Sequence, residues 1–223
     1  MEMTESRRAL VVHSALITPL YLIGSFFVGA LIGSVIFNGL PGHMQDDVKI
    51  LMAVLPTLIC VIAGGALWGR AMARLVQAGS VKRMMWAGAL GYGPTLILVG
   101  LALTVLENLI VEQRRGPALP IHVVFTILFV PAVFVVATVG AFALGVALKR
   151  WSSVARLALA SGLAAGAMFF AVDLVLDTIG YRVGGPGAAE RATMLTVLMT
   201  GNIAASLAGG AVIGLLLSGR RES

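Results

Sequence analysis

Two aspartates stand inside an otherwise apolar stretch, FFAVDLVLDTIGY. Asp173 and Asp177 are four residues apart, so a helix places both carboxylates on one face. Two ionised carboxylates this close repel each other, and a partner cation relieves that repulsion. The partner would be an arginine of the chain (Arg182, Arg114 or Arg115), or a transported proton, metal cation or cationic substrate. The pair is therefore the first candidate for a functional site.

Three further polar side chains in apolar segments join the two aspartates as candidates. They are Glu107, Asn202 and Asn38. Inside a membrane, ionisable and other polar groups are costly and usually mark substrate or ion pathways. The five residues together predict a polar transport site for a small solute or cation.

Patterns for catalysis or metal binding are weak. The histidines His13, His43 and His122 fall in separate segments. The serines in apolar segments have no histidine or lysine at a helpful position in the same helix to activate them. The single cysteine, Cys60, excludes an intrachain disulfide and a cysteine-based zinc cluster. We therefore expect no catalytic residues, no metal and no other cofactor. Two alternatives are left open: a loop metal site of His43 and His122 with an outer acid such as Asp46, and an intramembrane enzyme.

The composition is that of a membrane protein. Of the 223 residues, 59% are hydrophobic and 12% are charged, and the mean hydropathy is +0.98. Soluble domains average about 45–50% apolar and about 25% charged residues. A water-soluble fold of this size could not bury so much apolar surface, so a lipid bilayer is expected to cover it.

Six segments are long enough to cross a bilayer, because a helix needs about 20 apolar residues for this. The windows without Asp, Glu, Lys or Arg are 9–45, 50–69, 84–106, 116–148, 157–172 and 192–219. If the fifth window continues through Asp173, the predicted membrane helices are 9–38, 50–76, 84–108, 121–148, 154–179 and 192–218. The connections are short and contain glycine and proline, which suit turns. The prediction is a polytopic all-α membrane protein in which residues 1–223 form a single domain.

Depth in the membrane separates the acidic residues. Counted over about 20 residues from Leu157, the hydrocarbon layer ends at about residue 176. Asp173 then lies about 4.5 Å below the boundary, whereas Asp177 lies at the boundary. The same count places Glu107 in the interface. Asp173 is thus the acid whose burial most needs an explanation.

The basic residues predict the orientation of the helices. Most of them lie on the side of the N-terminus: Arg7, Arg8, Arg70, Arg74, Lys82, Arg83, Lys149, Arg150, Arg156, Arg220 and Arg221. By the positive-inside rule both termini are cytoplasmic, in a bacterial-type inner (plasma) membrane. The cations are scattered without an aromatic platform, so we expect contact with anionic lipids and no binding of nucleic acid.

An internal repeat of helix pairs is indicated by prolines and small residues. Pro19 and Pro56 recur at one constant interval as Pro94 and Pro131. A small-residue motif recurs in the second, fourth and sixth helices, with Gly65, Gly69, Gly140, Gly145, Gly210 and Gly214 as packing positions. Small residues let membrane helices approach closely. Three hairpins inserted the same way predict parallel repeats about an axis normal to the membrane. Chance similarity among apolar helices is the alternative.

Two functions fit these observations. The first is a small transporter or channel for a small solute or cation, with its path among the repeats. The second is a non-catalytic accessory or assembly subunit of a larger membrane complex, because the polar chemistry is sparse and the small-residue faces suit other subunits or self-association.

Overall fold

The chain is entirely helical over the residues that the structure describes. The structure is a computed structural model, and it describes residues 5–41, 44–112, 121–178 and 188–218. These residues form α1 (Glu5–Gly39), α2 (Asp46–Leu75), α3 (Val81–Glu112), α4 (Ile121–Ala147), the short 3-10 helix η1 (Trp151–Ser153), α5 (Val154–Thr178) and α6 (Ala188–Ser218), and no strand. The predicted all-α fold class is confirmed.

Five helices are long and apolar enough to cross a membrane within the described residues. They are α1, α2, α4, α5 and α6. Together they support a membrane protein with several spans. The sixth span, which would be α3, stays a prediction, as do the single domain and the cytoplasmic location of the termini.

Several helices begin before the predicted apolar segments. α2 begins at Asp46 rather than residue 50, and α6 begins at Ala188 rather than residue 192. A charged residue marks the edge of the hydrocarbon layer but does not end a helix, so charge-free windows underestimate helix length. α3 begins at Val81 because the backbone N–H of Arg83 donates to the Ser80 hydroxyl at 3.3 Å, which satisfies one of the free N–H groups of the first turn.

α2 and α4 end in the same way. Gln77 and Lys149 adopt left-handed conformations, with φ of 51° and 55°. The N–H groups of the next residues, Ala78 and Arg150, donate to carbonyls in the last helical turn at 2.9 and 3.1 Å. This arrangement satisfies carbonyls that a helix terminus leaves free and reverses the chain sharply.

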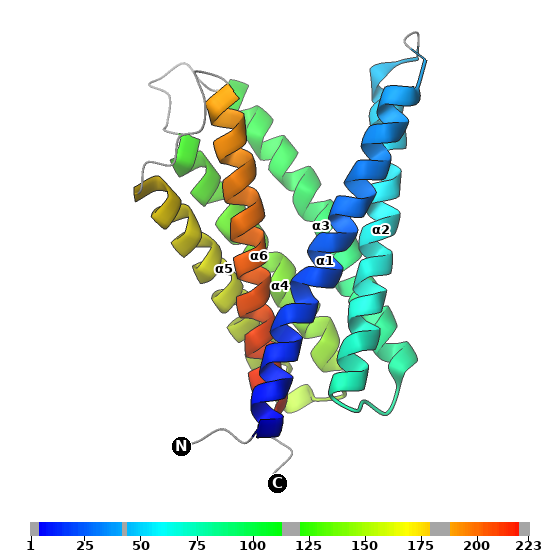
Figure 1. The fold of residues 1–223 in the computed structure, drawn as a ribbon, viewed down its shortest axis with the longest axis vertical. Coiled ribbons are helices and arrows are strands. Elements are labelled where there is room, and N and C mark those ends of the chain that lie inside the picture. The colour runs from blue at the N-terminus through cyan, green and yellow to red at the C-terminus, as the bar shows by residue number, and fades with distance from the viewer. Residues whose placement is uncertain (1–4, 42–43, 113–120, 179–187, 219–223) are drawn as a thin grey trace.

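The six helices form a ring. Each helix packs against its neighbours in the sequence, and α1 also packs against α6. The first residues of α1 and the last residues of α6 lie at the same end of the bundle, which we call the terminal end (Figure 1). Toward the other end, which we call the opposite end, α1 and α2 diverge from α5 and α6 (Figure 1).

Small residues lie where neighbouring helices approach most closely. Gly65 and Gly69 of α2 face the backbone of Gly88 and Met84 on α3. The other four glycines of the repeated motif also face neighbouring helices: Gly140 faces Tyr92, Gly145 faces Val154, and Gly210 and Gly214 face Ser14. A Cβ atom at any of these positions would enter a tight contact, so glycine allows the helices to pack this closely.

Candidate functional site

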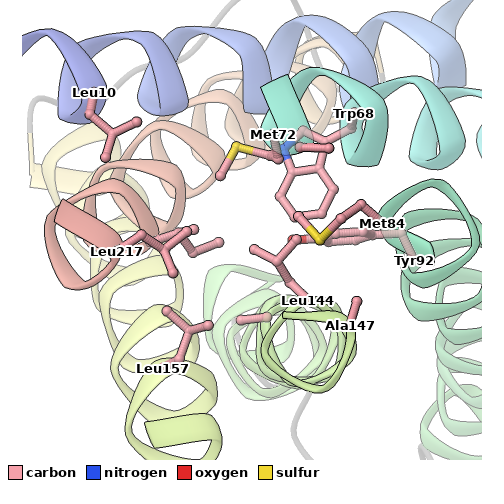
Figure 2. Packing of buried hydrophobic residues seen from close by; sticks show 12 residues of the cluster. Leu10, Trp68, Met72, Met84, Tyr92, Leu144, Ala147, Leu157 and Leu217 are labelled. Atoms are coloured by element: carbon pink, nitrogen blue, oxygen red, sulfur yellow. The ribbon is translucent and has the colours of Figure 1, made fainter. Parts of the chain in front are cut away.

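A cluster of buried side chains fills the centre of the ring near the terminal end. We call it the central cluster, and all six helices contribute to it (Figure 2). Its members are Leu10, Trp68, Met72, Ala73, Met84, Tyr92, Ala141, Leu144, Ala147, Leu157, Ile213 and Leu217. Trp68, Met72, Met84 and Leu144 have no exposed surface. Large apolar side chains therefore close the ring at the terminal end.

Trp68 joins the central cluster to a chain of polar contacts. Its indole Nε1–H donates to Thr18 Oγ1 at 3.0 Å, and the Thr18 hydroxyl donates to the Ser14 carbonyl at 2.7 Å. The Ser14 hydroxyl in turn donates to the Gly210 carbonyl of α6 at 2.8 Å. The rings of Trp68 and Tyr92 meet edge to face, with centroids 5.0 Å apart. These contacts tie α1, α2, α3 and α6 together at one level of the bundle.

The ring-facing side of α6 becomes polar beyond the central cluster. Ile213 and Leu217 point into the cluster, and Ser206 and Asn202 follow on the same face at helical spacing. Both side chains are half-buried. The Asn202 amide donates to the Leu198 carbonyl at 2.7 Å. Neutral hydrogen-bonding groups thus line this side of the ring.

The ring-facing sides of α1 and α2 remain apolar beyond the central cluster. Tyr21 packs on the cluster, and Val28, Ile32 and Val35 continue its face of α1 at helical spacing. These three side chains are 53%, 44% and 73% exposed within the chain. On α2, Val54 lies on the same face as Trp68 and is also exposed.

α1 and α6 contact each other only near the terminal end, as far as the structure describes them. Their close contacts join Arg7, Ser14 and Thr18 of α1 to Ser218, Gly214 and Gly210 of α6. Beyond this level the two helices separate (Figure 1). The contacts that join α1 to α6 therefore lie in the half of the bundle near the terminal end.

Asp173 is buried between α5 and α4. It is 6% exposed, and its Oδ2 accepts a hydrogen bond from the Thr126 hydroxyl. On the same face of α5, Gly162 and Gly166 face Phe134 of α4. Asp173 thus points toward α4, and among the described residues its hydrogen-bond partner is a hydroxyl rather than a cation.

Of the other predicted site residues, the structure describes the side chains of only Asn38 and Asn202. Asn38 is exposed near the opposite end of α1, and Asn202 lies on α6. Asp177 belongs to α5 and Glu107 to α3, but their side chains are outside the described residues. The arginines considered as partners, Arg114, Arg115 and Arg182, also lie outside them.

Few of the described side chains could bind a metal ion or act in catalysis. These contain no group of three or more His, Cys, Asp or Glu side chains that could hold a metal ion. The ring of His13 is exposed, and its Nδ1 lies 2.7 Å from the Ala9 carbonyl in the same helix. His43 and the side chain of His122 lie outside the described residues, so the loop metal site stays an untested alternative.

The chain was compared with models of known protein families, with curated proteins and with solved structures, and nothing matched. A functional assignment therefore rests on the physical features of the ring.

The central cluster and the Trp68 contacts are the parts of the site that the sequence did not predict. A signal was present, because Trp68 and Tyr92 are large aromatic residues within small-residue segments of their helices, next to Gly69 and Gly91. Polar aromatic side chains buried in a protein usually find a hydrogen-bond partner. The partner of Trp68, however, lies fifty residues away on α1, and no local pattern identifies it.

Proposed function

We propose that this chain is a small membrane transporter whose substrate path follows the axis of the helix ring. The observation that carries the proposal is the difference between the two ends: the central cluster fills the ring at the terminal end, whereas α1 separates from α6 toward the opposite end. A path closed at one end and accessible at the other is what a carrier presents in one of its two alternating states.

The inner-membrane location and the cytoplasmic orientation of the terminal end remain part of the proposal, and the positive-inside pattern supports them. On this orientation the central cluster closes the path toward the cytoplasm. The expectation that the chain is not an enzyme is likewise a prediction.

The contacts of the repeated motif support three parallel hairpins. The small-residue motif opens with Gly64-Gly65, Gly140-Ala141 and Gly209-Gly210 in its three copies. The opening glycine faces the preceding helix in each copy: Gly64 faces Ser25, Gly140 faces Tyr92 and Gly209 faces Ser161. Its last glycine faces the following helix in each copy: Gly69 faces Met84, Gly145 faces Val154 and Gly214 faces Ser14. Because α1 follows α6 around the ring, the third copy obeys the same rule as the first two.

In this proposal the candidate residues lie at different places along the substrate path. Asn202 lies on the ring-facing side of α6 and is the best-placed contact for a substrate. Asp173, which accepts a hydrogen bond from Thr126, contributes at the α4–α5 contact. The involvement of Asp177, Glu107 and Asn38 at the outer mouth of the path stays a prediction.

Flux through liposomes tests the proposal. The purified chain would be reconstituted, and the entry of a panel of neutral solutes and salts would be followed by stopped-flow light scattering. We expect faster entry of at least one solute than into empty liposomes. Trp68→Ala should change this rate because it removes a core side chain of the central cluster. Trp86→Ala is the matched control, since Trp86 is 58% exposed. If no solute enters faster than into empty liposomes, the transporter proposal is wrong.

An accessory or assembly subunit is the second candidate, and a face of α5 favours it. Ala160, Ala164, Ala167 and Ala171 share one face, and Ala167 and Ala171 are exposed within the chain. Small residues at this spacing suit close docking of another membrane helix. Ala167→Leu should then abolish stoichiometric copurification with other subunits in mild detergent, whereas Leu159→Ala, at a 53% exposed position on another side of α5, should not. A chain that purifies alone and is active in liposomes contradicts this second function.

A further inference from the structure

Two cations lie at one level on the outer side of the α2–α3 hairpin, near its turn at the terminal end (Figure 1). Gly69 of α2 faces the Met84 carbonyl of α3, and helix geometry then places Arg70 and Lys82 within about 2 Å of the same height. Trp68 and Met84 point into the central cluster (Figure 2). Arg70 and Lys82 are each two residues from one of them, on the opposite side of the helix, and both are exposed. We call Arg70 and Lys82 the cation pair.

The described part of the chain offers no carboxylate to the cation pair. No Asp or Glu occurs between Asp47 and Glu107, and these two acids belong to the parts of α2 and α3 at the opposite end. The one described acid at the terminal end is Glu5. It lies about 20 Å along α1 from Thr18, the residue that contacts α2 at Trp68. The cation pair is therefore suited to an anion that another molecule supplies.

The cation pair lies at the edge of the hydrocarbon layer. The windows without charged residues end at residue 69 on α2 and begin at residue 84 on α3, so both helices leave the apolar zone at the same level. Trp86 lies one turn from Lys82 on the same side of α3 and is 58% exposed. Exposed tryptophan is typical of the membrane interface, where its ring lies at the level of the lipid headgroups.

The same outer side becomes apolar toward the opposite end. Ile59 of α2 and Leu90 of α3 are each 59% exposed, and they continue the sides of Arg70 and Trp86 at helical spacing. Cations, an aromatic ring and apolar side chains thus follow one another in the order of phosphate, glycerol and acyl chain in a phospholipid. A soluble phosphate would contact only the cations, and an acidic protein segment would leave the apolar side chains uncovered.

We infer that the outer side of the α2–α3 hairpin binds an anionic phospholipid of the phosphatidylglycerol class, in the leaflet at the terminal end. Its phosphate is held between Arg70 and Lys82, its glycerol region lies against Trp86, and its acyl chains lie along Ile59 and Leu90. This goes beyond the general contact with anionic lipids expected from the scattered cations, because one pair at one level binds one headgroup. The inference does not depend on the proposed transport function.

Quenching of tryptophan fluorescence by brominated acyl chains tests where the lipid lies. The purified chain in mild detergent would be titrated with brominated phosphatidylglycerol and, separately, with brominated phosphatidylcholine. We expect saturable quenching that needs a several-fold lower concentration of phosphatidylglycerol. Trp86→Phe should remove this saturable part, whereas Trp151→Phe should keep it, since Trp151 is 69% exposed in η1, outside the hairpin. Equal half-saturating concentrations for the two lipids, or saturable quenching that Trp86→Phe leaves intact, overturn the inference.

Charge variants test the cation pair in the same titration. In Arg70→Gln/Lys82→Gln the half-saturating concentration of phosphatidylglycerol should rise about 25-fold, about fivefold for each lost cation, which corresponds to about 1 kcal/mol per cation. Arg8→Gln/Arg156→Gln is the matched control. It loses the same charge from exposed positions on α1 and α5, which are not neighbours in the ring, and should leave the concentration nearly unchanged. Equal shifts in the two variants would show a general attraction and overturn the inference.

Competition separates a lipid headgroup from a free anion. Unbrominated phosphatidylglycerol should reverse the quenching, whereas inorganic phosphate at constant ionic strength should not. Reversal by inorganic phosphate would show a site for a soluble anion and overturn the inference. The comparison of lipids and the competition both use the unmodified chain, so they decide the question even if a charge variant does not fold. Solute flux in liposomes is a separate measurement, and its absence would leave this lipid site standing.

Discussion

Two buried hydrogen bonds between helices distinguish the two polar regions of the molecule. Trp68 and Thr18 join α2 to α1 at the central cluster, whereas Thr126 and Asp173 join α4 to α5 nearer the opposite end. Inside a membrane such bonds have been worth about 0.6 kcal/mol on average and up to about 1.7 kcal/mol. Both are therefore expected to contribute modestly to stability.

The Trp68–Thr18 bond should be measurable as a coupling energy. Thr18→Val keeps the shape of the side chain but removes the acceptor of the indole N–H, so we expect a loss of about 1 kcal/mol of unfolding free energy. In a double-mutant cycle with Trp68→Phe, denaturant unfolding in mild detergent should give a coupling energy of about 0.5 kcal/mol or more. Strictly additive losses would show that the bond contributes nothing.

The partner of Asp173 can be identified by comparing two substitutions. Asp173→Asn keeps an oxygen that accepts the hydrogen bond from Thr126, so we expect a change of a few tenths of a kcal/mol. Asp173→Leu removes the acceptor and should cost about 1 kcal/mol. Both values would come from unfolding in mild detergent. If Asp173→Asn destabilises as strongly as Asp173→Leu, the charge matters and a cation is the partner.

The glycines of the motif should differ sharply in their tolerance of a methyl group. In Gly69→Ala the new Cβ meets the backbone carbonyl of Met84, so α2 and α3 must move apart, at a cost of about 1–3 kcal/mol. Gly24→Ala is the matched control, because a Cβ there has nothing within 4 Å. Melting temperatures in mild detergent would compare them, and equal melting temperatures would contradict the close packing.

At the residue scale, the sequence indicated which side chains were unusual but not what they contact. The depth count singled out Asp173, which is indeed buried. Its contact with Thr126 depends on how α4 and α5 are rotated, and many rotations satisfy the same apolar composition. The Trp68 contacts were missed for the same physical reason, since they join helices that are distant in the sequence.

At the scale of elements, α1 is packed differently along its length. Its first half contacts α6 and the central cluster. Its second half is buried only at Gly29 and Gly33, which face α2. The second half of α1 is therefore held mainly by α2.

Spin-label distances test this difference between the two halves of α1. In a Cys60→Ser background, labels at Phe26 and Met199, which lie at about the same level beyond the Ser14–Gly210 contact, should be farther apart than labels at Ala9 and Leu215, because α1 and α6 diverge beyond Gly210. Pulsed electron resonance on the chain in lipid would give both distances. Equal distances would mean that α1 and α6 stay parallel in the membrane.

The helices themselves were largely predictable from the sequence, because about 20 apolar residues between charges leave few alternatives to a membrane helix. The predicted second and sixth helices were too short at their N-terminal ends. The structure begins them at Asp46 and Ala188, because charged residues there continue the helix at the surface. The closure of the ring through α1 and α6 could not be predicted, since apolar helices are interchangeable by composition.

At the scale of the whole molecule, a surrounding lipid bilayer explains both the apolar composition and the ring of helices. The bilayer covers the large exposed apolar side chains, and the central cluster fills the interior of the ring at the terminal end. In the proposed transport function, a substrate passes only if α1 and α6 separate at the terminal end, where Arg7 Nε donates to the Ser218 hydroxyl at 3.2 Å.

Locking the terminal end tests this account most directly. Arg7→Cys and Ser218→Cys, in a Cys60→Ser background, would be joined by a short bifunctional maleimide, and solute movement would be measured in liposomes before and after cross-linking. The account predicts that the double variant transports and that cross-linking stops it. Transport at an unchanged rate after complete cross-linking would contradict a path that opens between α1 and α6.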